Sequence, residues 1–258
     1  MASGSGSETT DLASIDNHWK FPCNHDAAEP PATAYDRITT IKVSEGSTSR
    51  EFLVYRGVLC FHSELFKRAF NSNFKEGDLD VYEVTDYKIV TFEMFYNWIN
   101  TGIPTIGLKQ MDKYYQALDL YIFTDFYTIP SLKNCAIEAH MCVYLGKRAT
   151  DLTSIKAIYE RTPENSPLRK LLVDIRVDWY SFKTLKTFVA GWGFDFAADI
   201  IEASRARSVV PGVGSGDMTR DQWTKRMRGD FCTRYHDHTV LESVDQKDVD
   251  ADSQMETD

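Results

Sequence analysis

The sequence predicts an α+β fold in which a short β-sheet, formed early in the chain, is followed by a long helical remainder. Two patterns carry this prediction. Apolar residues alternate with polar ones between residues 41 and 55, and from Thr91 onward they recur at helical spacing. A third observation is size, because 258 residues with 43% hydrophobic content are enough to bury a substantial core.

The predicted sheet begins with a hairpin. Residues 41–43 and 50–55 alternate between apolar and polar side chains, and the turn sequence Glu45-Gly46-Ser47 separates them. Apolar residues at near-helical intervals then predict a helix over residues 59–70, directly after the strand. A further short strand is expected at residues 81–84.

The helical part is predicted from stripes of apolar residues. The first stripe contains Phe92, Phe95, Tyr96 and Ile99, and it stops at the segment Thr101-Gly102-Ile103-Pro104. The same spacing predicts later helices that cover residues 114–129, 132–146, 152–159, 168–179, 185–192 and 196–203.

Composition divides the chain into four parts. Residues 1–34 are rich in Ser, Gly, Pro and acids without periodicity, which predicts a disordered tail. Residues 35–146 form the predicted sheet-and-helix domain, and residues 147–204 form a helical extension. Residues 205–258 are expected to hold a flexible linker, a short basic helix and a second acidic, disordered tail.

The charge distribution argues against nucleic acid as a partner. Residues 1–34 carry a net charge of −4 and residues 240–258 one of −6, so the body carries +1 of the total of −9. One basic cluster stands out: Lys225, Arg226 and Arg228, flanked by Arg220 and Arg234. It fits a nuclear import signal, an anion contact or a solvated helix face, and the solvated face is the favoured interpretation.

The sequence shows neither a membrane-spanning stretch nor a secretory signal, and its five cysteines include no C-x-x-C pair. We therefore expect an intracellular protein with free thiols, in the cytoplasm, the nucleus or both.

Residues 35–146 resemble a BTB/POZ domain, in particular its fungal form. Asp36 matches the acidic residue before the first strand, and Arg56 matches the basic residue at the end of the second, although Tyr55 stands where the family has histidine. The family's Cys-x-x-Ser-x-x-Phe helix start is present as Cys60, Ser63 and Phe66. The segments FNSNFKEG, FEMFYNWINTGIP and, in the extension, YERTPENSPLRKLLVD are similar to fungal relatives.

The resemblance implies a function through protein partners and not through catalysis. BTB domains form homodimers or associate with other proteins, and many bind a cullin scaffold as substrate adaptors of ubiquitin ligases. Such adaptors carry a hydrophobic-x-Glu element, which Phe74, Lys75 and Glu76 match. The alternative for this segment is that Phe74 packs into its own core.

The resemblance also allows a second function, that of a nuclear transcription regulator that recruits partners through the same domain. The resemblance also places Asp36 and Arg56 as a charged pair near the dimer groove, and an intramolecular salt bridge explains them equally well.

The sequence contains none of the common catalytic or nucleotide-binding motifs, so neither an enzyme nor a cofactor is predicted. Cys232, His236 and His238 form a C-x3-H-x-H cluster of the kind that zinc accepts. A structural zinc site needs a fourth ligand, and Cys23 is the only other distant cysteine that looks exposed. The favoured interpretation is a polar helix end without a metal.

Overall fold

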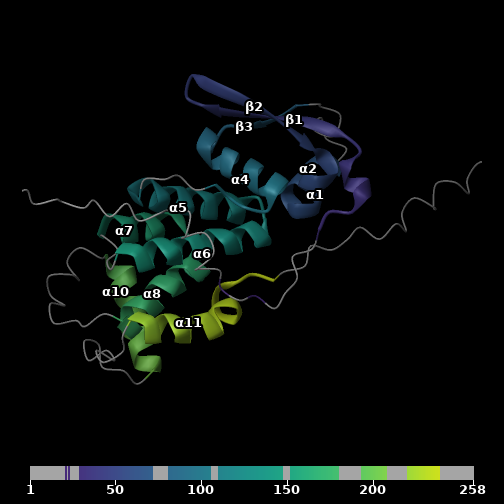
Figure 1. Ribbon diagram of the computed structural model, residues 1–258. Helices are drawn as coiled ribbons and strands as arrows, with labels where there is room; N and C mark the ends of the chain where they lie inside the picture. The colour runs from purple at the N-terminus through teal and green to yellow at the C-terminus, as the bar shows by residue number, and fades with distance from the viewer. Residues whose placement is uncertain are drawn as a thin grey trace, which may run out of the picture.

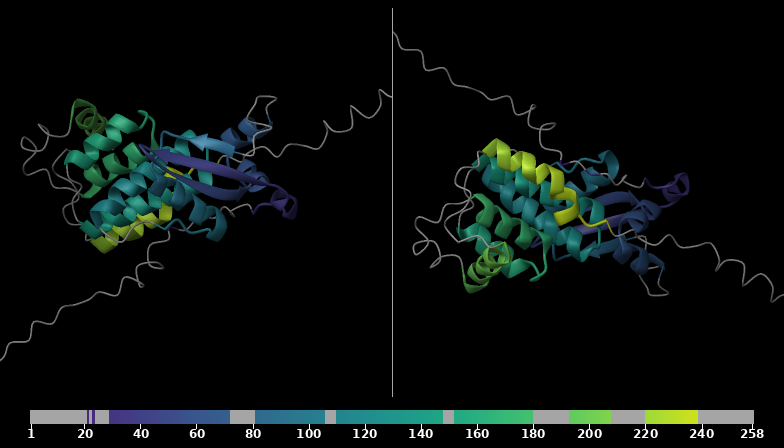
Figure 2. Two further views of the ribbon diagram at one scale, coloured as in Figure 1. Left: turned by 90° about the horizontal axis from the view of Figure 1, so that it is seen from above. Right: turned by 90° about the horizontal axis from the view of Figure 1, so that it is seen from below.

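A small sheet lies at one end of the molecule and helices occupy the rest (Figures 1 and 2). The structure is a computed structural model that describes residues 21, 23, 29–71, 81–105, 110–147, 152–179, 193–207 and 220–238. Its elements are the 3-10 helix η2 (Ala32–Tyr35), the strands β1 (Ile38–Glu45), β2 (Thr48–Tyr55) and β3 (Val81–Val84), and the helices α1 (Arg56–His62), α2 (Glu64–Asn71), α4 (Ile89–Thr101), α5 (Gln110–Phe126), α6 (Pro130–Lys147), α7 (Leu152–Arg161), α8 (Pro167–Trp179), α10 (Phe194–Ala206) and α11 (Arg220–Tyr235). The α+β prediction is confirmed.

The sheet has the strand order β2-β1-β3. Strands β1 and β2 form the predicted antiparallel hairpin, with Ile38 opposite Tyr55 and Glu45 opposite Thr48. Gly46 in the turn has a φ of 61°, a conformation that glycine adopts without a steric penalty. Strand β3 pairs with the other edge of β1 in the parallel direction.

The helix expected over residues 59–70 is in fact two helices, α1 and α2, separated at Ser63. Ser63 is extended, with φ −135° and ψ 117°, and it is fully buried. Its Oγ accepts a hydrogen bond from the amide of Phe66 at 3.1 Å, as an N-cap of α2 does, and donates one to the Tyr127 carbonyl oxygen at 2.5 Å. This side chain therefore ends one helix, begins the next, and ties both to the end of α5.

The inner face of the sheet packs against α4. Ile41 and Val43 of β1 are fully buried, and the Phe52 ring of β2 lies 4.8 Å from the Phe92 ring of α4. Each buried side chain of this size contributes about 1.5–3 kcal/mol. Helix α4 ends where the sequence predicted, at Gly102, whose φ of 74° lets its amide bond back to the Trp98 carbonyl.

The helical extension shares the core of the sheet-bearing part. The Tyr114 hydroxyl of α5 donates to the Ser154 carbonyl of α7 at 3.1 Å, and Tyr121 of α5 hydrogen-bonds Ser166 Oγ, just before α8, at 3.0 Å. One cluster of buried apolar residues runs from β1 to α11. Helices α5, α6, α7, α8 and α10 correspond to predicted helices, and the helix predicted at residues 185–192 lies outside the described residues.

The N-terminal segment differs from the expected disordered tail at two points. Helix η2 begins at Ala32, ahead of the expected domain boundary at residue 35. Phe21 is 3% exposed, and its ring stacks on Phe231 of α11 at 3.9 Å. The sequence around Phe21 has no sustained periodicity, so it does not indicate a contact with a helix more than 200 positions away.

Candidate interaction surfaces and a cysteine–histidine cluster

Large apolar side chains gather on the outer face of the sheet. Ile38 and Tyr55 are opposite each other, and Leu53 and Val81 both pair with Thr40, so these four project from the same face. The Tyr35 ring adjoins this face and contacts the Tyr55 ring edge-on at 5.2 Å. We call the following exposed residues the outer sheet face: Tyr35, Ile38, Leu53, Tyr55 and Val81.

Polar groups border the outer sheet face along the same strands. Lys42 of β1 forms an ion pair with Glu83 of β3 at 3.1 Å, and Glu51 of β2 lies opposite Lys42. An apolar centre with a polar margin is the usual composition of a protein–protein interface. The outer sheet face and its border have this composition.

The charged pair Asp36 and Arg56 lies beside this surface, at the start of β1 and of α1. Asp36 Oδ1 accepts a hydrogen bond from the Arg37 amide at 2.7 Å. Arg56 donates to the Phe70 carbonyl oxygen, and its guanidinium lies 4.9 Å from the centre of the Phe70 ring. Burial raises the pKa of the Cys60 thiol; the nearby charges of Arg56 and Lys67 oppose this increase, and that of Asp36 adds to it.

The predicted docking residues Phe74, Lys75 and Glu76 lie outside the described residues, between the end of α2 and the start of β3. What the structure describes is the N-terminal base of this segment. Phe70, in the last turn of α2, is 2% exposed and is held by Arg56. The base is therefore fixed by a charged hydrogen bond and by core packing.

A buried carboxylate holds the last helices together. Asp174 of α8 is 2% exposed and accepts hydrogen bonds from Arg234 Nη2 at 2.6 Å, from the Tyr235 hydroxyl at 2.6 Å, and from Arg207. Arg207 also donates to Asp178 Oδ1 at 2.6 Å. Burial, together with the charge of Asp174, raises the pKa of Tyr235. The end of α11 is thereby fixed on α8.

The ion pairs of Asp174 also bear on which residues of the predicted basic cluster are exposed. Arg234 points to a buried carboxylate and so does not belong to an exposed basic surface. Lys225 and Arg226 are exposed on α11, and Arg228 is partly buried. The exposed positive charge on the described part of this helix therefore centres on Lys225 and Arg226.

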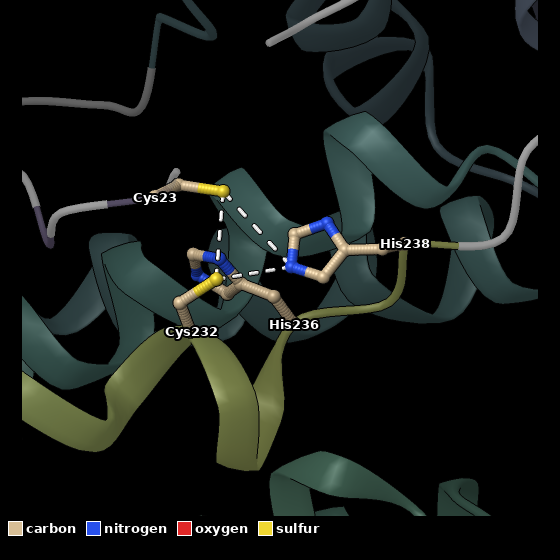
Figure 3. A group of neighbouring side chains, drawn as sticks. All are labelled: Cys23, Cys232, His236 and His238. Atoms are coloured by element: carbon tan, nitrogen blue, oxygen red, sulfur yellow. Dashed lines mark hydrogen bonds between the residues drawn. The ribbon is translucent and has the colours of Figure 1, made fainter. Parts of the chain in front are cut away.

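Four residues of metal-binding types, two cysteines and two histidines, meet where α11 ends (Figure 3). Cys23, Cys232, His236 and His238 each place one donor atom within 4.8 Å of those of the other three. The Cys232 sulfur lies 3.5 Å from the Cys23 sulfur and 3.0 Å from His238 Nε2, and Cys23 lies 4.0 Å from the same nitrogen. The sequence motif contains three of these residues, and the fold brings Cys23, the candidate fourth ligand, next to them.

Neighbouring residues hold this cluster in place. The Asn134 side chain of α6 donates to the Asp237 carbonyl at 2.9 Å and accepts from the Asp237 amide at 2.7 Å. Lys133 lies 3.9 Å from the Asp237 carboxylate. His236 Nε2 lies 3.2 Å from a carboxylate oxygen of Glu138. The short segment that carries the two histidines is thus anchored to α6.

Across the described ranges, every helix is too short or too polar to cross a lipid bilayer.

Residues 39–133 match the family model of the BTB/POZ domain, a family of protein-interaction domains and not of enzymes. The match begins in β1 and ends in the first turn of α6. It includes Leu53, Tyr55 and Val81 of the outer sheet face and the Arg56 contacts, whereas Tyr35 and Ile38 precede it. The chain has no significant match among curated proteins.

Proposed function

We propose, from the BTB/POZ domain that residues 39–133 form, that this chain is a protein-interaction module that associates with a second copy of itself through the outer sheet face. The observation that supports this most directly is the exposure of four apolar side chains on adjoining strands: Ile38, Leu53, Tyr55 and Val81. Contiguous apolar surface of this kind is removed from water when proteins associate.

Sedimentation equilibrium over a range of concentrations tests this proposal. The wild-type chain should show twice its monomer mass of 29.5 kDa, and Leu53→Glu should shift the protein to monomer. Ile201→Glu is the matched control, because Ile201 of α10 is 62% exposed and Leu53 is 63% exposed. A wild-type protein that stays monomeric at every concentration contradicts self-association and leaves other proteins as the partners of this face.

The finer role within this proposal is that of a substrate adaptor for a cullin-type ubiquitin ligase. Its support is the match of Phe74, Lys75 and Glu76 to the hydrophobic-x-Glu element, together with the fixed base of that segment at Phe70. An aromatic side chain that fills a pocket is a common energetic anchor of an interface. The fungal form of the domain belongs to the same proposal and rests on the segments FNSNFKEG and FEMFYNWINTGIP.

Co-purification from cells tests the adaptor role. The wild-type chain should bring down a cullin, and Phe74→Ala/Glu76→Ala should abolish this while circular dichroism shows an unchanged fold. Lys75→Ala is the control, because the middle position of the element is not specified. A wild-type chain that brings down no cullin rules the role out.

The alternative role, a nuclear transcription regulator, is supported by the adjacent exposed positive charges of Lys225 and Arg226 on α11. Exposed basic clusters serve as nuclear import signals. Lys225→Ala/Arg226→Ala should then abolish nuclear accumulation, whereas Lys156→Ala/Arg205→Ala, at two separate exposed positions, should not. Equal distribution of both double variants would exclude this import signal.

A further inference from the structure

The cysteine–histidine cluster has the donor set of a structural metal site. Two cysteines and two histidines are a common ligand set for structural Zn²⁺, which prefers four ligands in a tetrahedron. Soft thiolates combined with imidazoles favour zinc over the oxygen-seeking ions Mg²⁺ and Ca²⁺. We propose that Cys23, Cys232, His236 and His238 bind one zinc ion that closes the N-terminal segment onto α11.

The spacing of the donors fits this coordination. An ion with Zn–S bonds of about 2.3 Å and Zn–N bonds of about 2.05 Å separates two tetrahedral sulfurs by ~3.8 Å and a sulfur from a nitrogen by ~3.6 Å. The two sulfurs are 3.5 Å apart, and His238 Nε2 lies 3.0 Å from one and 4.0 Å from the other. Shifts of a few tenths of an ångström would bring all three separations to the tetrahedral values.

His236 supplies an independent observation. Its side chain is 2% exposed; Nε2 lies 3.2 Å from a Glu138 carboxylate oxygen, and neither ring nitrogen forms a hydrogen bond of good geometry to the described residues. An imidazole buried in this way costs free energy unless something satisfies its nitrogens. Zinc-binding histidines commonly turn their second nitrogen to a carboxylate. Nε2 lies beside Glu138, so Nδ1 is the nitrogen that this arrangement leaves for the ion.

The surroundings orient the donors before an ion binds. Asn134 bonds both backbone groups of Asp237, the residue between the two histidines. The amide of His236 donates to the Cys232 carbonyl at 3.1 Å, so these two residues stand one helical turn apart at the end of α11. A preorganised site loses less conformational entropy when the ion binds.

The charges also balance. Two thiolates neutralise the double positive charge of the ion, so the occupied site carries no net charge although Cys232 is buried. A disulfide is the other product that two close thiols can form. It requires a sulfur–sulfur distance of about 2.05 Å, and at 3.5 Å the Cys23 and Cys232 sulfurs are not joined by a disulfide.

Zinc at this site would tie together parts of the chain that are far apart in sequence. Cys23 precedes the BTB/POZ domain, and the other three ligands follow the helical extension. The stacked rings of Phe21 and Phe231 lie next to the cluster and already bring the two segments together. The ion therefore closes the long loop between the N-terminal segment and α11, and we expect a structural and not a catalytic role.

Metal content of the full-length protein, prepared without a polyhistidine tag, tests the proposal. After zinc loading and dialysis, mass spectrometry should find about one zinc per chain. Cys23→Ser/Cys232→Ser and His238→Asn should each retain less than one tenth of that amount, and Cys142→Ser, a cysteine of α6 outside the cluster, should retain all of it. Cys23 is exposed, so Cys23→Ser alone serves as a variant that keeps the fold.

Two further measurements separate zinc binding from its alternatives. Co²⁺-loaded protein should show the visible absorption of a tetrahedral site and a sulfur-to-cobalt charge-transfer band, both absent in Cys23→Ser. Chelation should lower the melting temperature by roughly 5 °C or more. The proposal is overturned if the loaded wild-type protein holds no zinc, if Cys23→Ser and His238→Asn hold as much zinc as wild type, or if the non-reduced protein is two hydrogens lighter because Cys23 and Cys232 are joined.

Discussion

Arg56 shows how one side chain offsets an unfavourable position in the chain. It is the first residue of α1, where the partial positive charge of a helix N-terminus disfavours a cation. Its guanidinium instead reaches the last turn of α2, donates to the Phe70 carbonyl and lies over the Phe70 ring. The C-terminal end of a helix favours a positive charge. The interaction of Arg56 with the end of α2 therefore offsets its unfavourable position at the start of α1.

We therefore expect Arg56→Ala to lower the free energy of unfolding by about 1.5–3 kcal/mol, the range for hydrogen bonds to charged groups. Urea unfolding followed by circular dichroism measures this change. Arg68→Ala is the control, because Arg68 is 79% exposed in an i,i+4 pair with Glu64, and such pairs contribute less than about 0.5 kcal/mol. Equal losses in the two variants would show that the Phe70 contact is not stabilising.

At the residue scale, sequence spacing identified important residues, but it was a poorer guide to the residues that they contact. Asp36 and Arg56 as a charged pair near a dimer groove stay a prediction, and the structure shows that each also bonds a backbone group, the Arg37 amide and the Phe70 carbonyl. Cys23 was named only as a distant candidate for a fourth ligand, and it meets Cys232 across 209 positions. Periodicity reports neighbours within one helix or strand, so contacts between distant elements stay hidden until the fold is known.

At the scale of elements, alternation and helical stripes predicted the hairpin, β3 and most of the helices. The single helix expected over residues 59–70 was wrong, because Ser63 is an N-cap whose hydroxyl also binds the Tyr127 carbonyl. A serine inside a helical stripe signals this weakly, since serine also occurs within helices. Only the tertiary bond to α5 makes the break necessary.

Gly57 explains how η2 packs against α1. A Cβ at this position would lie 2.5 Å from the Ala34 carbonyl oxygen and 2.7 Å from its Cα, and both are backbone atoms that cannot rotate away. Gly57→Ala should therefore displace η2 and lower the free energy of unfolding by about 1–3 kcal/mol.

Thermal unfolding measures the effect of Gly57→Ala, and Gly229→Ala is its matched control. Gly229 lies within α11, where a Cβ would meet nothing within 4 Å. Alanine there should raise stability by roughly 0.5–1 kcal/mol, because glycine is the poorer helix former. A Gly57→Ala protein as stable as wild type would mean that the close contact with Ala34 does not exist in solution.

At the scale of the whole molecule, the helical extension and the BTB/POZ domain share one core. Tyr114 and Tyr121 of α5 bond to Ser154 and Ser166 of the extension, so the boundary expected near residue 146 is not a break in packing. The sequence predicted the order of these helices. It could not predict that α11 would return to α8 through Asp174, because that contact depends on how all the intervening helices pack.

The shared core also buries histidines as neutral groups, and this predicts a dependence of stability on pH. Burial lowers the pKa of His62, whose ring packs against Trp98 at 4.8 Å, to about 4. Burial lowers the pKa of His140, whose ring meets Tyr114 at 5.1 Å, to about 3. In the unfolded chain both groups titrate near 6.5. Between pH 6.5 and 4 the unfolded state therefore binds more protons than the folded state does.

Each histidine thus contributes stability that is fully present above pH 6.5 and is lost as the pH falls towards its folded pKa, by roughly 1.4 kcal/mol per pH unit within that window. Urea unfolding of the metal-free protein at pH 7 and pH 5 measures the loss of stability. His62→Phe keeps an aromatic ring against Trp98 but removes one titrating group. Its stability should therefore fall less between pH 7 and pH 5 than that of wild type, by the contribution of His62. Nuclear magnetic resonance gives the direct check: the His62 and His140 ring signals should not titrate above pH 5, and a midpoint near 6.5 for either ring would mean that water reaches it in the folded protein.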